Sequence, residues 1–212
     1  MQTEGWREMS RSFIYDSLLP RLTSRWYREV LERVPEGASV LDVGMGTASA
    51  LLANADRVEQ KGLRVTGIDI DADYIDRARK QLAKSSVSER VEARLESVYD
   101  HQGGPYEAVY FSASFMLLPD QVGALRHCTA ILAPGGRLYF TQTIHQRRVR
   151  WLEWLKPMLK HLTSADFGRV TYEDGFRSEL ARGGLDVVEF TTLASHGNQT
   201  YCLAVAKPAE TA

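Results

Sequence analysis

The sequence predicts an α/β protein with a doubly wound, mainly parallel sheet of seven strands. Short apolar runs alternate with helical segments through most of the chain, an order that gives parallel strands with helices on both faces. A glycine-containing turn follows the first of these runs. The last two runs are joined by a short polar turn without a helix, and they must be antiparallel because a parallel return needs a long crossover.

The first half of the chain is predicted to begin with helices. Apolar side chains recur at helical spacing over residues 12–34, and Pro20 interrupts them, which indicates two short helices. The segments that follow are assigned from their period and boundary residues: strands at 39–43, 64–70 and 91–98, an Ala/Leu-rich helix at 47–61, and a charged amphipathic helix at 71–86.

Turn residues divide the second half. Gly103-Gly104-Pro105 precedes a strand, and Pro119 begins a helix that Pro134-Gly135-Gly136 closes. The predicted elements are strands at 106–112, 137–143, 185–192 and 200–206, and helices at 119–132, 146–162 and about 172–182. The final hairpin turn is Ser195-His196-Gly197-Asn198.

Charge and composition exclude several classes of partner. Twenty-six basic residues balance 27 acidic ones to a net charge of −1, so no basic field attracts nucleic acid. Cys128 and Cys202 lie far apart without metal-binding spacing, so both are expected to be reduced and no metal site is predicted. No leader-like or membrane-spanning apolar segment is found, and we expect a cytoplasmic protein without stable membrane insertion.

The turn after the first strand is predicted to form the floor of a ligand site. In doubly wound sheets, ligands bind beyond the carboxyl ends of the strands, and Gly44-Met45-Gly46 occupies the first such turn. Asp69 ends the second strand, where an acid can accept hydrogen bonds from both hydroxyls of a ribose. The pair of features indicates a nucleoside ligand.

Asp42, just before the glycines, narrows the choice of nucleoside. An acid near the end of a buried strand is costly unless it accepts hydrogen bonds from loop amides or reaches a cation. It suits a cofactor with an ammonium group better than a diphosphate. A dinucleotide fingerprint would also have glycine where Ser49 stands, and a phosphate-binding P-loop would have lysine after the glycines.

Five motifs in order resemble the class I S-adenosylmethionine-dependent methyltransferases. They are the stretch VLDVGMGT with Asp42, the acid Asp69 in VTGIDID, the strand YEAV at 106–109, the turn LAPGG at 132–136, and the closing hairpin. The resemblance covers about residues 38–206 and departs from the GxGxG motif at Ala48. The pair Tyr15-Asp16 gives a further, general similarity to quinone and small-metabolite methyltransferases.

This resemblance implies a Rossmann-like sheet and S-adenosyl-L-methionine as cofactor, with S-adenosyl-L-homocysteine as product. The implied cofactor residues are Tyr15, Asp42, Gly44, Met45, Gly46, Asp69, Ile70, Ser97, Val98 and Ser112. Gly44 and Gly46 would lie against the methionine part, Asp69 would hold the ribose, and Ile70 would pack on the adenine. Ser112 would approach the sulfonium end.

The other implied contacts concern the adenine and the closure of the site. Ser97 and Val98 would flank the ring, although many relatives carry an acid at the position of Ser97. Tyr15 sits where relatives often close over the cofactor. Phe13, Tyr15, Phe111 and Phe115 could present ring faces to the sulfonium, and the alternative for Phe13 and Phe115 is a place in the core.

The implied reaction is an in-line displacement that moves the methyl group from sulfur to an O, N, S or C nucleophile. The cofactor carries the reactive methyl, so the protein mainly positions the partners and excludes water. His145 follows the fifth strand and is a candidate base, or else a solvated loop residue. His101 and His196 are expected at the surface.

The predicted organisation is one domain over 1–212, with a small, partly apolar acceptor. Its parts are an N-terminal helical cap at 1–37, a cofactor-binding core at 38–143, a helical lid at 144–183 and a terminal β-hairpin at 184–207. The cationic residues Arg147, Arg148 and Arg150 indicate either a solvated face or peripheral contact with an anionic surface through 147–160.

Three questions stay open from the sequence. An NAD-dependent oxidoreductase and a non-catalytic cofactor-binding protein remain as alternatives, although Ser49 and the closing hairpin disfavour the first. The acceptor and its reacting atom are not encoded in any motif. The sequence also leaves the oligomeric state undetermined.

Overall fold

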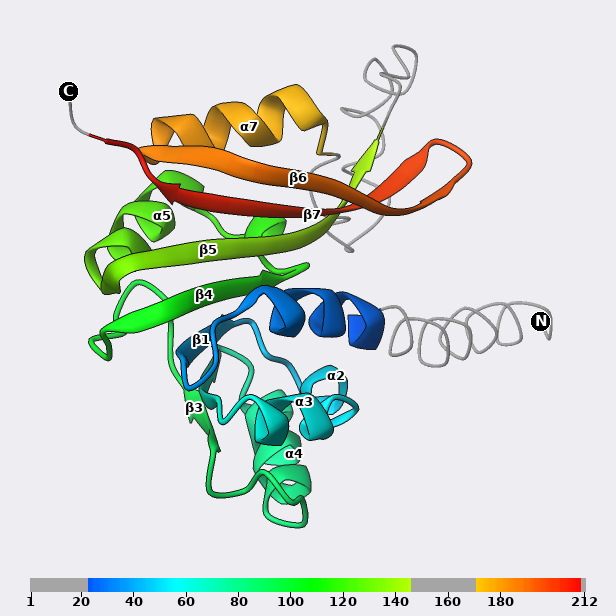
Figure 1. Cartoon of the computed structure of the whole chain (residues 1–212), viewed down its shortest axis with the longest axis vertical. Helices are drawn as coiled ribbons and strands as arrows, with labels where there is room; N and C mark the ends of the chain where they lie inside the picture. The colour runs from blue at the N-terminus through cyan, green and yellow to red at the C-terminus, as the bar shows by residue number, and fades with distance from the viewer. Residues whose placement is uncertain (1–22, 146–170, 211–212) are drawn as a thin grey trace, which may run out of the picture.

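The computed structural model of the protein describes residues 23–145 and 171–210. Its sheet has seven strands in the order β3-β2-β1-β4-β5-β7-β6 (Figure 1). The strands are β1 (Ser39–Val43), β2 (Arg64–Asp69), β3 (Val91–Leu95), β4 (Tyr106–Ser112), β5 (Leu132–His145), β6 (Leu185–His196) and β7 (Gln199–Pro208). Strand β7 is antiparallel to both neighbours, and the other pairs are parallel. The predicted fold class is confirmed.

The described helices lie on both faces of this sheet. They are helix 23–33, α2 (Ser49–Leu52), α3 (Ala55–Gln60), α4 (Ala72–Leu82), the short 3-10 helix η1 (Phe115–Leu117), α5 (Gln121–Ala130) and α7 (Glu173–Arg182). One buried cluster packs helix 23–33, α2, α3 and α4 against one face of the sheet, through residues such as Val30, Leu51 and Ile75. The other joins η1, α5 and α7 to the opposite face, through Leu125 and Phe176.

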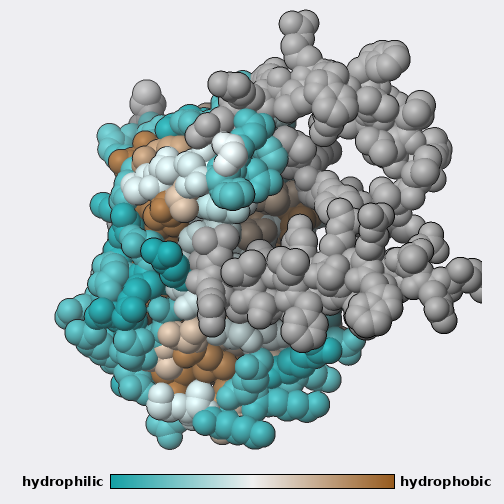
Figure 2. Space-filling model, turned by 90° about the vertical axis from the view of Figure 1, so that its right-hand side faces the viewer, coloured by the Kyte–Doolittle hydropathy of each residue, from teal (hydrophilic) through white to brown (hydrophobic). Residues whose placement is uncertain are grey.

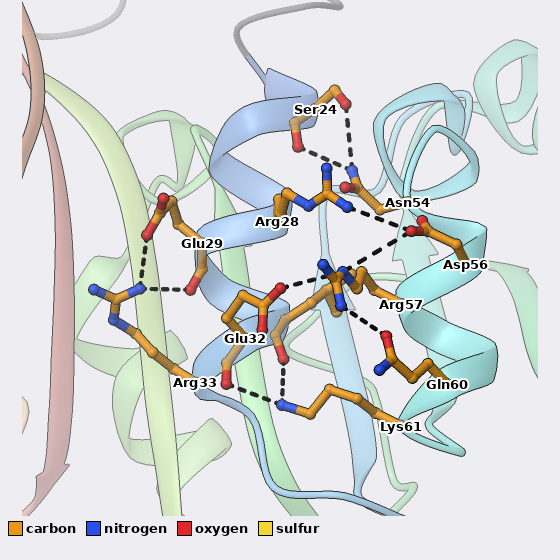
Figure 3. A network of polar contacts seen from close by, with 11 residues as sticks. Ser24, Arg28, Glu29, Glu32, Arg33, Asn54, Asp56, Arg57, Gln60 and Lys61 are labelled. Carbon is orange, nitrogen blue, oxygen red and sulfur yellow. Dashed lines mark hydrogen bonds and ion pairs between the residues drawn. The ribbon is translucent and has the colours of Figure 1, made fainter.

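Helix 23–33 is anchored to α3 by a network of polar contacts (Figure 3). The Nδ2 atom of Asn54 donates to the carbonyl of Ser24 at 2.9 Å, and Nζ of Lys61 donates to the carbonyl of Leu31 at 2.7 Å. Arg28 and Asp56 add an exposed ion pair at 3.3 Å. Exposed ion pairs contribute little, so the buried apolar face and the Asn54 contacts hold this helix.

Asn54 also explains why the predicted helix over 47–61 is wrong as a single element. The chain forms two short helices there, and Asn54 is the residue before the second. Its buried side chain donates to the carbonyl of Ala50 as well as to that of Ser24. A side-chain amide that bonds to the backbone competes with continuous helix, and here it ends one turn and connects it to helix 23–33.

Strand β5 is longer than the predicted strand at 137–143. It begins at Leu132, which pairs with Tyr106, and the register shifts between Tyr106 and Ala108. The glycines at 135 and 136 therefore lie inside an irregular start of the strand, with Gly135 at a φ of +80°. The prediction of a separate turn there is wrong because the turn residues form a bulged extension instead.

The described surface is mostly hydrophilic on the face shown in Figure 2, with the hydrophobic colour gathered in a few patches. The large apolar side chains that are exposed are Ile70, Tyr74, Leu95, Leu117 and Val188. Within the described ranges, no helix is both long and apolar enough to span a bilayer.

Candidate functional site

The glycine turn after β1 has the conformation that its sequence requires. Gly44 and Gly46 have φ angles of +78° and +58°, in the left-handed region that favours glycine. The amides of Gly44 and Met45 both donate to the carbonyl of Ile68, at 2.8 and 3.2 Å. A Cβ on Gly44 would lie 2.6 Å from the Cβ of Ser114, so the segment after β4 packs directly on the turn.

Ala48 occupies the position where the resemblance has a third glycine. Its φ of 61° is left-handed, and its side chain is buried in the core cluster around α2. A left-handed alanine costs about 1–2 kcal/mol, but the buried methyl regains about 0.8 kcal/mol. The departure from the motif therefore keeps the backbone path of the glycine and changes only its strain and packing.

Asp69 connects the glycine turn to the start of α4. Its Oδ2 accepts from the amide of Gly46 at 2.9 Å, and its Oδ1 accepts from the amide of Asp71 at 3.0 Å. The side chain of Asp71 in turn caps α4 by accepting from the amides of Asp73 and Tyr74. Each carboxylate oxygen of Asp69 keeps a second lone pair, so this residue can fix the turn and still accept from a ligand.

Asp42 lies buried beneath the turn, and its partner is a tyrosine rather than a loop amide. The hydroxyl of Tyr27, on helix 23–33, donates to Oδ2 of Asp42. Oδ1 of Asp42 is buried and has no hydrogen-bond partner within the described part of the chain. Burial raises the pKa of Asp42 to about 7, which the Tyr27 hydrogen bond opposes and the nearby charge of Asp69 supports.

Met45 contributes its backbone to the turn and its side chain to the core. The side chain is only 6% exposed and belongs to the cluster on the α4 side of the sheet. A Cβ on Gly67 of β2 would lie 2.1 Å from Sδ of Met45. The predicted contact between Met45 and a cofactor is therefore open only to its main chain, and Gly67 makes the space for its side chain.

We expect Gly67→Val to lower the free energy of unfolding by about 1–3 kcal/mol, because the added side chain overlaps Met45 in a packed core. Met45→Ala alone is expected to cost about 2–5 kcal/mol. In the double variant the overlap is absent. Its loss of stability should therefore be at least about 1 kcal/mol smaller than the sum of the losses in the two single variants. Urea denaturation of the four proteins measures this, and strict additivity would contradict the packing argument.

The strand ends beside Asp69 form an apolar edge. Asp69 pairs in register with Leu95, the last residue of β3, and Leu95 is 52% exposed. Ile70 follows β2 and is 78% exposed. Ser97 is partly buried and its Oγ accepts from the amide of Tyr99 at 3.3 Å. Val98, by contrast, is buried in the cluster on the α5 side.

The end of β4 places Ser112 at the same edge of the sheet. Ser112 is partly buried and pairs with Thr141 of β5. Phe111 and Phe115 are buried and belong to an aromatic group with Phe140 and Phe176, with ring centroids 5.1 to 5.9 Å apart. The idea that Phe111 offers a ring face to the cofactor is wrong, and the core alternative for Phe115 is confirmed.

His145 is the last residue of β5 rather than a loop residue. Its backbone amide donates to the carbonyl of Thr171 at 2.9 Å, and it pairs with Gln199 of β7. It lines a pocket of about 430 Å³ together with Tyr172, Phe190 and Thr192, among others. Phe13, Tyr15, the three arginines and the segment 147–160 lie outside the described residues.

His101 corrects the expectation of a surface histidine. It is fully buried, with Nδ1 2.9 Å from Oε2 of Glu96 and Nε2 2.9 Å from the hydroxyl of Tyr106. His127 also bonds to the carbonyl of His101 at 2.6 Å. The loop composition around His101 is polar, but a histidine with a carboxylate and a phenol as partners can be buried at little cost. His196 is exposed, as expected.

We expect Tyr106→Phe to lower the free energy of unfolding by about 1–3 kcal/mol, because it leaves Nε2 of His101 buried without a partner. Tyr74→Phe, at a half-exposed position on α4, is the matched control and should change stability by less than about 0.5 kcal/mol. Thermal and urea unfolding measure both, and equal effects would contradict the assignment.

Three residues of this region have no sequence-based prediction. Tyr27 could be found from its place on the buried face of helix 23–33, since a buried tyrosine hydroxyl needs a partner. Gly67 is a glycine inside a strand pattern, which signals a close approach. Ser114, whose hydroxyl donates to the carbonyl of Val43, gives no signal in the sequence.

Comparison with known proteins relates the segment that contains this turn to methyltransferases. Residues 40–136 match the family model described as a methyltransferase domain. Ubiquinone biosynthesis O-methyltransferase of Xanthomonas axonopodis pv. citri is 34% identical to the chain over 110 residues, which cover 50% of this chain and 44% of that protein. The chain thus matches less than half of the length of this relative.

Solved structures extend the similarity to most of the chain at the level of the fold. Geranyl diphosphate C-methyltransferase from Streptomyces coelicolor has a TM-score of 0.66 at 14% identity, covering 87% of this chain and 80% of that one. The cyclase SpnF has a TM-score of 0.69 at 16% identity, covering 90% and 82%. At such identities the likeness shows the fold alone, and the cyclase illustrates that this fold also serves other reactions.

Proposed function

We propose that the protein transfers the methyl group of S-adenosyl-L-methionine to a small organic acceptor. The observation that carries this proposal is the arrangement at the first turn, where the carboxylate of Asp69 bonds to the amide of Gly46 beside a buried, half-partnered acid. The methyltransferase family match covers the same turn. Methyl transfer needs little chemistry from the protein, because the cofactor supplies the reactive group when bound.

The proposed cofactor contacts follow the strand ends. Gly44 and Gly46 let the methionine part approach the backbone, because neither has a Cβ. Asp69 accepts from the ribose hydroxyls with its remaining lone pairs. Asp42 has an unpartnered Oδ1 beneath the turn. Its negative charge attracts the ammonium group of the cofactor, because buried charges interact more strongly in the low dielectric of the protein interior.

The adenine is proposed to rest on the apolar edge beyond β2 and β3. Ile70 and Leu95 are both largely exposed there, which is unusual for apolar side chains at strand ends. Ser97 and Val98 follow Leu95 in the chain and would border the ring, Val98 mainly through its backbone because its side chain is buried. Tyr15 is proposed, from the sequence resemblance alone, to close over the cofactor.

The acceptor is proposed to bind beyond β4 and β5. The sulfonium end would lie near Ser112, and His145 at the end of β5 lines the 430 Å³ pocket, a volume in the range of small-molecule sites. His145 would act as a base only for an acceptor that must lose a proton as it is methylated. The relative from Xanthomonas axonopodis pv. citri is named for O-methylation in ubiquinone biosynthesis, and this supports a hydroxylated acceptor.

Incubation of the purified chain with a metabolite extract and methyl-labelled S-adenosylmethionine tests this function directly. The expected result is one labelled small molecule, identified by mass, that is absent with the Asp69→Ala variant. A thermal shift with S-adenosylhomocysteine but not with NAD is expected in parallel, since the dinucleotide fingerprint is incomplete at Ser49. A shift with NAD alone would favour the oxidoreductase alternative, and cofactor binding without product would favour a non-catalytic role.

A further inference from the structure

A second pocket lies on the α5 and α7 side of the sheet, beside Gln142 of β5. The side chain is 1% exposed, and both Oε1 and Nε2 are buried without a hydrogen-bond partner within the described residues. The backbone of Gln142 pairs with Cys202 of β7, and its carbonyl also accepts from Sγ of Cys202 at 3.5 Å. Buried amides without partners are rare in folded proteins, since the lost hydration is then uncompensated.

Gln142 lines a pocket of about 170 Å³ between η1, α5 and α7. Phe115, Tyr172 and Phe176 give this pocket aromatic residues, and Gln121 and Glu179 contribute polar ones. Gln121 already donates to the carbonyl of Phe115 at 3.0 Å. Of the two glutamines, Gln142 alone therefore has both amide atoms free to receive a ligand.

Three properties of the pocket define the chemistry of its ligand. A cavity of about 150 Å³ admits one benzene ring, so about 170 Å³ suits a single six-membered ring. The glutamine amide presents a donor and an acceptor side by side, which complements an acceptor and a donor on neighbouring atoms. The described residues that line the pocket include no cationic side chain, and Glu179 is paired with Arg182 at 2.8 Å, so this lining offers no charge that would favour an anionic ligand.

We propose that this pocket recognises a neutral six-membered ring bearing a hydrogen-bond donor and acceptor on adjacent atoms, and that Gln142 determines this specificity. The inference rests on the proposed function, for which the ring is the acceptor or part of it. Gln142 follows Thr141, the register partner of Ser112 at the end of β4. Tyr172 lines both this pocket and the larger one at His145, so the two are neighbours.

A matched pair of ligands tests the proposal on the unaltered full chain. The probes are 2-pyridone, which has an N–H beside its carbonyl, and 1-methyl-2-pyridone, which lacks that donor. We expect 2-pyridone to bind about tenfold more tightly in ligand-observed NMR titrations, since one hydrogen bond to a buried partner is lost in the methylated ring. Equal affinities, or no binding of 2-pyridone at millimolar concentration, would overturn the proposal without any variant.

The variant Gln142→Met separates recognition from a structural role. Methionine is close in size and has no unpartnered amide, so we expect Tm to rise by about 2–6 °C while the preference for 2-pyridone disappears. Gln60→Met, the same change at an exposed position of α3, should leave the preference unchanged. A lower Tm together with an unchanged preference would assign Gln142 a structural role and overturn the proposal.

The two proposals fail in different ways. A chain that discriminates between the two pyridones but does not bind S-adenosylhomocysteine in calorimetry would contradict the proposed function and leave the ring specificity intact. A chain that binds S-adenosylhomocysteine but treats the two pyridones alike would overturn only the ring specificity.

Discussion

Replacing Asp69 with alanine is expected to weaken the binding of S-adenosylhomocysteine by about a hundredfold or more. Two hydrogen bonds from ribose hydroxyls to a carboxylate account for this, at about 1.5–3 kcal/mol each. The same change removes the acceptor of the Gly46 and Asp71 amides, so the glycine turn also loses its connection to α4. Isothermal titration calorimetry with the purified variant measures the loss.

The effect on folding must be separated from the effect on binding. We expect Asp69→Ala to lower the free energy of unfolding by about 1–3 kcal/mol, because two backbone amides lose a charged partner. Asp76→Ala, an exposed position on α4, is the matched control and should preserve both stability and affinity. An Asp69→Ala protein that is folded and binds the ligand as tightly as the unaltered chain would show that the ribose lies elsewhere.

The protonation of Asp42 is expected to make cofactor binding strongly dependent on pH. Burial raises the pKa of this carboxyl to about 7, so most of it is protonated at pH 5.5. If an ammonium group requires the ionised form, the affinity for S-adenosylhomocysteine should be roughly 25-fold lower at pH 5.5 than at pH 7.5. Binding at pH 6 should release about one proton, which calorimetry in phosphate and in Bis-Tris buffer can count.

The same group predicts a pH dependence of stability in the ligand-free protein. An unfolded aspartate has a pKa of about 3.9, so between pH 4 and 7 the folded state holds a proton that the unfolded state has released. The stability contributed by protonated Asp42 is therefore present at low pH and is lost as the pH rises toward 7, by about 4 kcal/mol in all. Above pH 7 both states are ionised and the dependence ends.

Two variants test whether Asp42 is the source of the pH dependence of stability and of the proton release on binding. Glu92 and Glu189 act in the opposite direction, because hydrogen bonds from Arg94 and Arg33 lower their pKa values, and their contribution is lost only as the pH falls through those lowered values. In Asp42→Asn the loss between pH 4 and 7 and the proton release should both vanish. In Tyr27→Phe the transition should move to higher pH, because the hydrogen bond that favours the charged form is gone. Identical pH profiles in all three proteins would exclude Asp42.

The strands of this fold could be predicted from sequence because burial on both faces makes them near-continuous apolar runs. The predicted bounds of β1 and β4 agree with the structure to the residue. The closing antiparallel pair followed from the short turn between two strands. The helix boundaries were harder, since Asn54 ends α2 through contacts with helix 23–33 that no local pattern encodes.

The candidate site was predictable where local backbone geometry dictates the residue. Gly44 and Gly46 need positive φ, and an acid at the end of β2 faces the same edge of the sheet, so both signals are local. The partner of Asp42 was not predictable, because Tyr27 lies on a separate helix and reaches the acid only after that helix packs on the sheet. The prediction of a surface position for His101 was wrong for the same reason, because Glu96 and Tyr106 contact its ring only in the folded loop.

The glycine turn depends on strand β2, because Met45 of the turn packs over Gly67 of that strand. This contact limits how the turn can be exchanged between proteins. The side chain of Met45 occupies the space that a side chain at position 67 would fill. A turn sequence transplanted from another protein would bring a different side chain at position 45 and would meet a gap or an overlap. Engineering of the glycine turn in this chain therefore has to treat the turn and the middle of β2 as one unit.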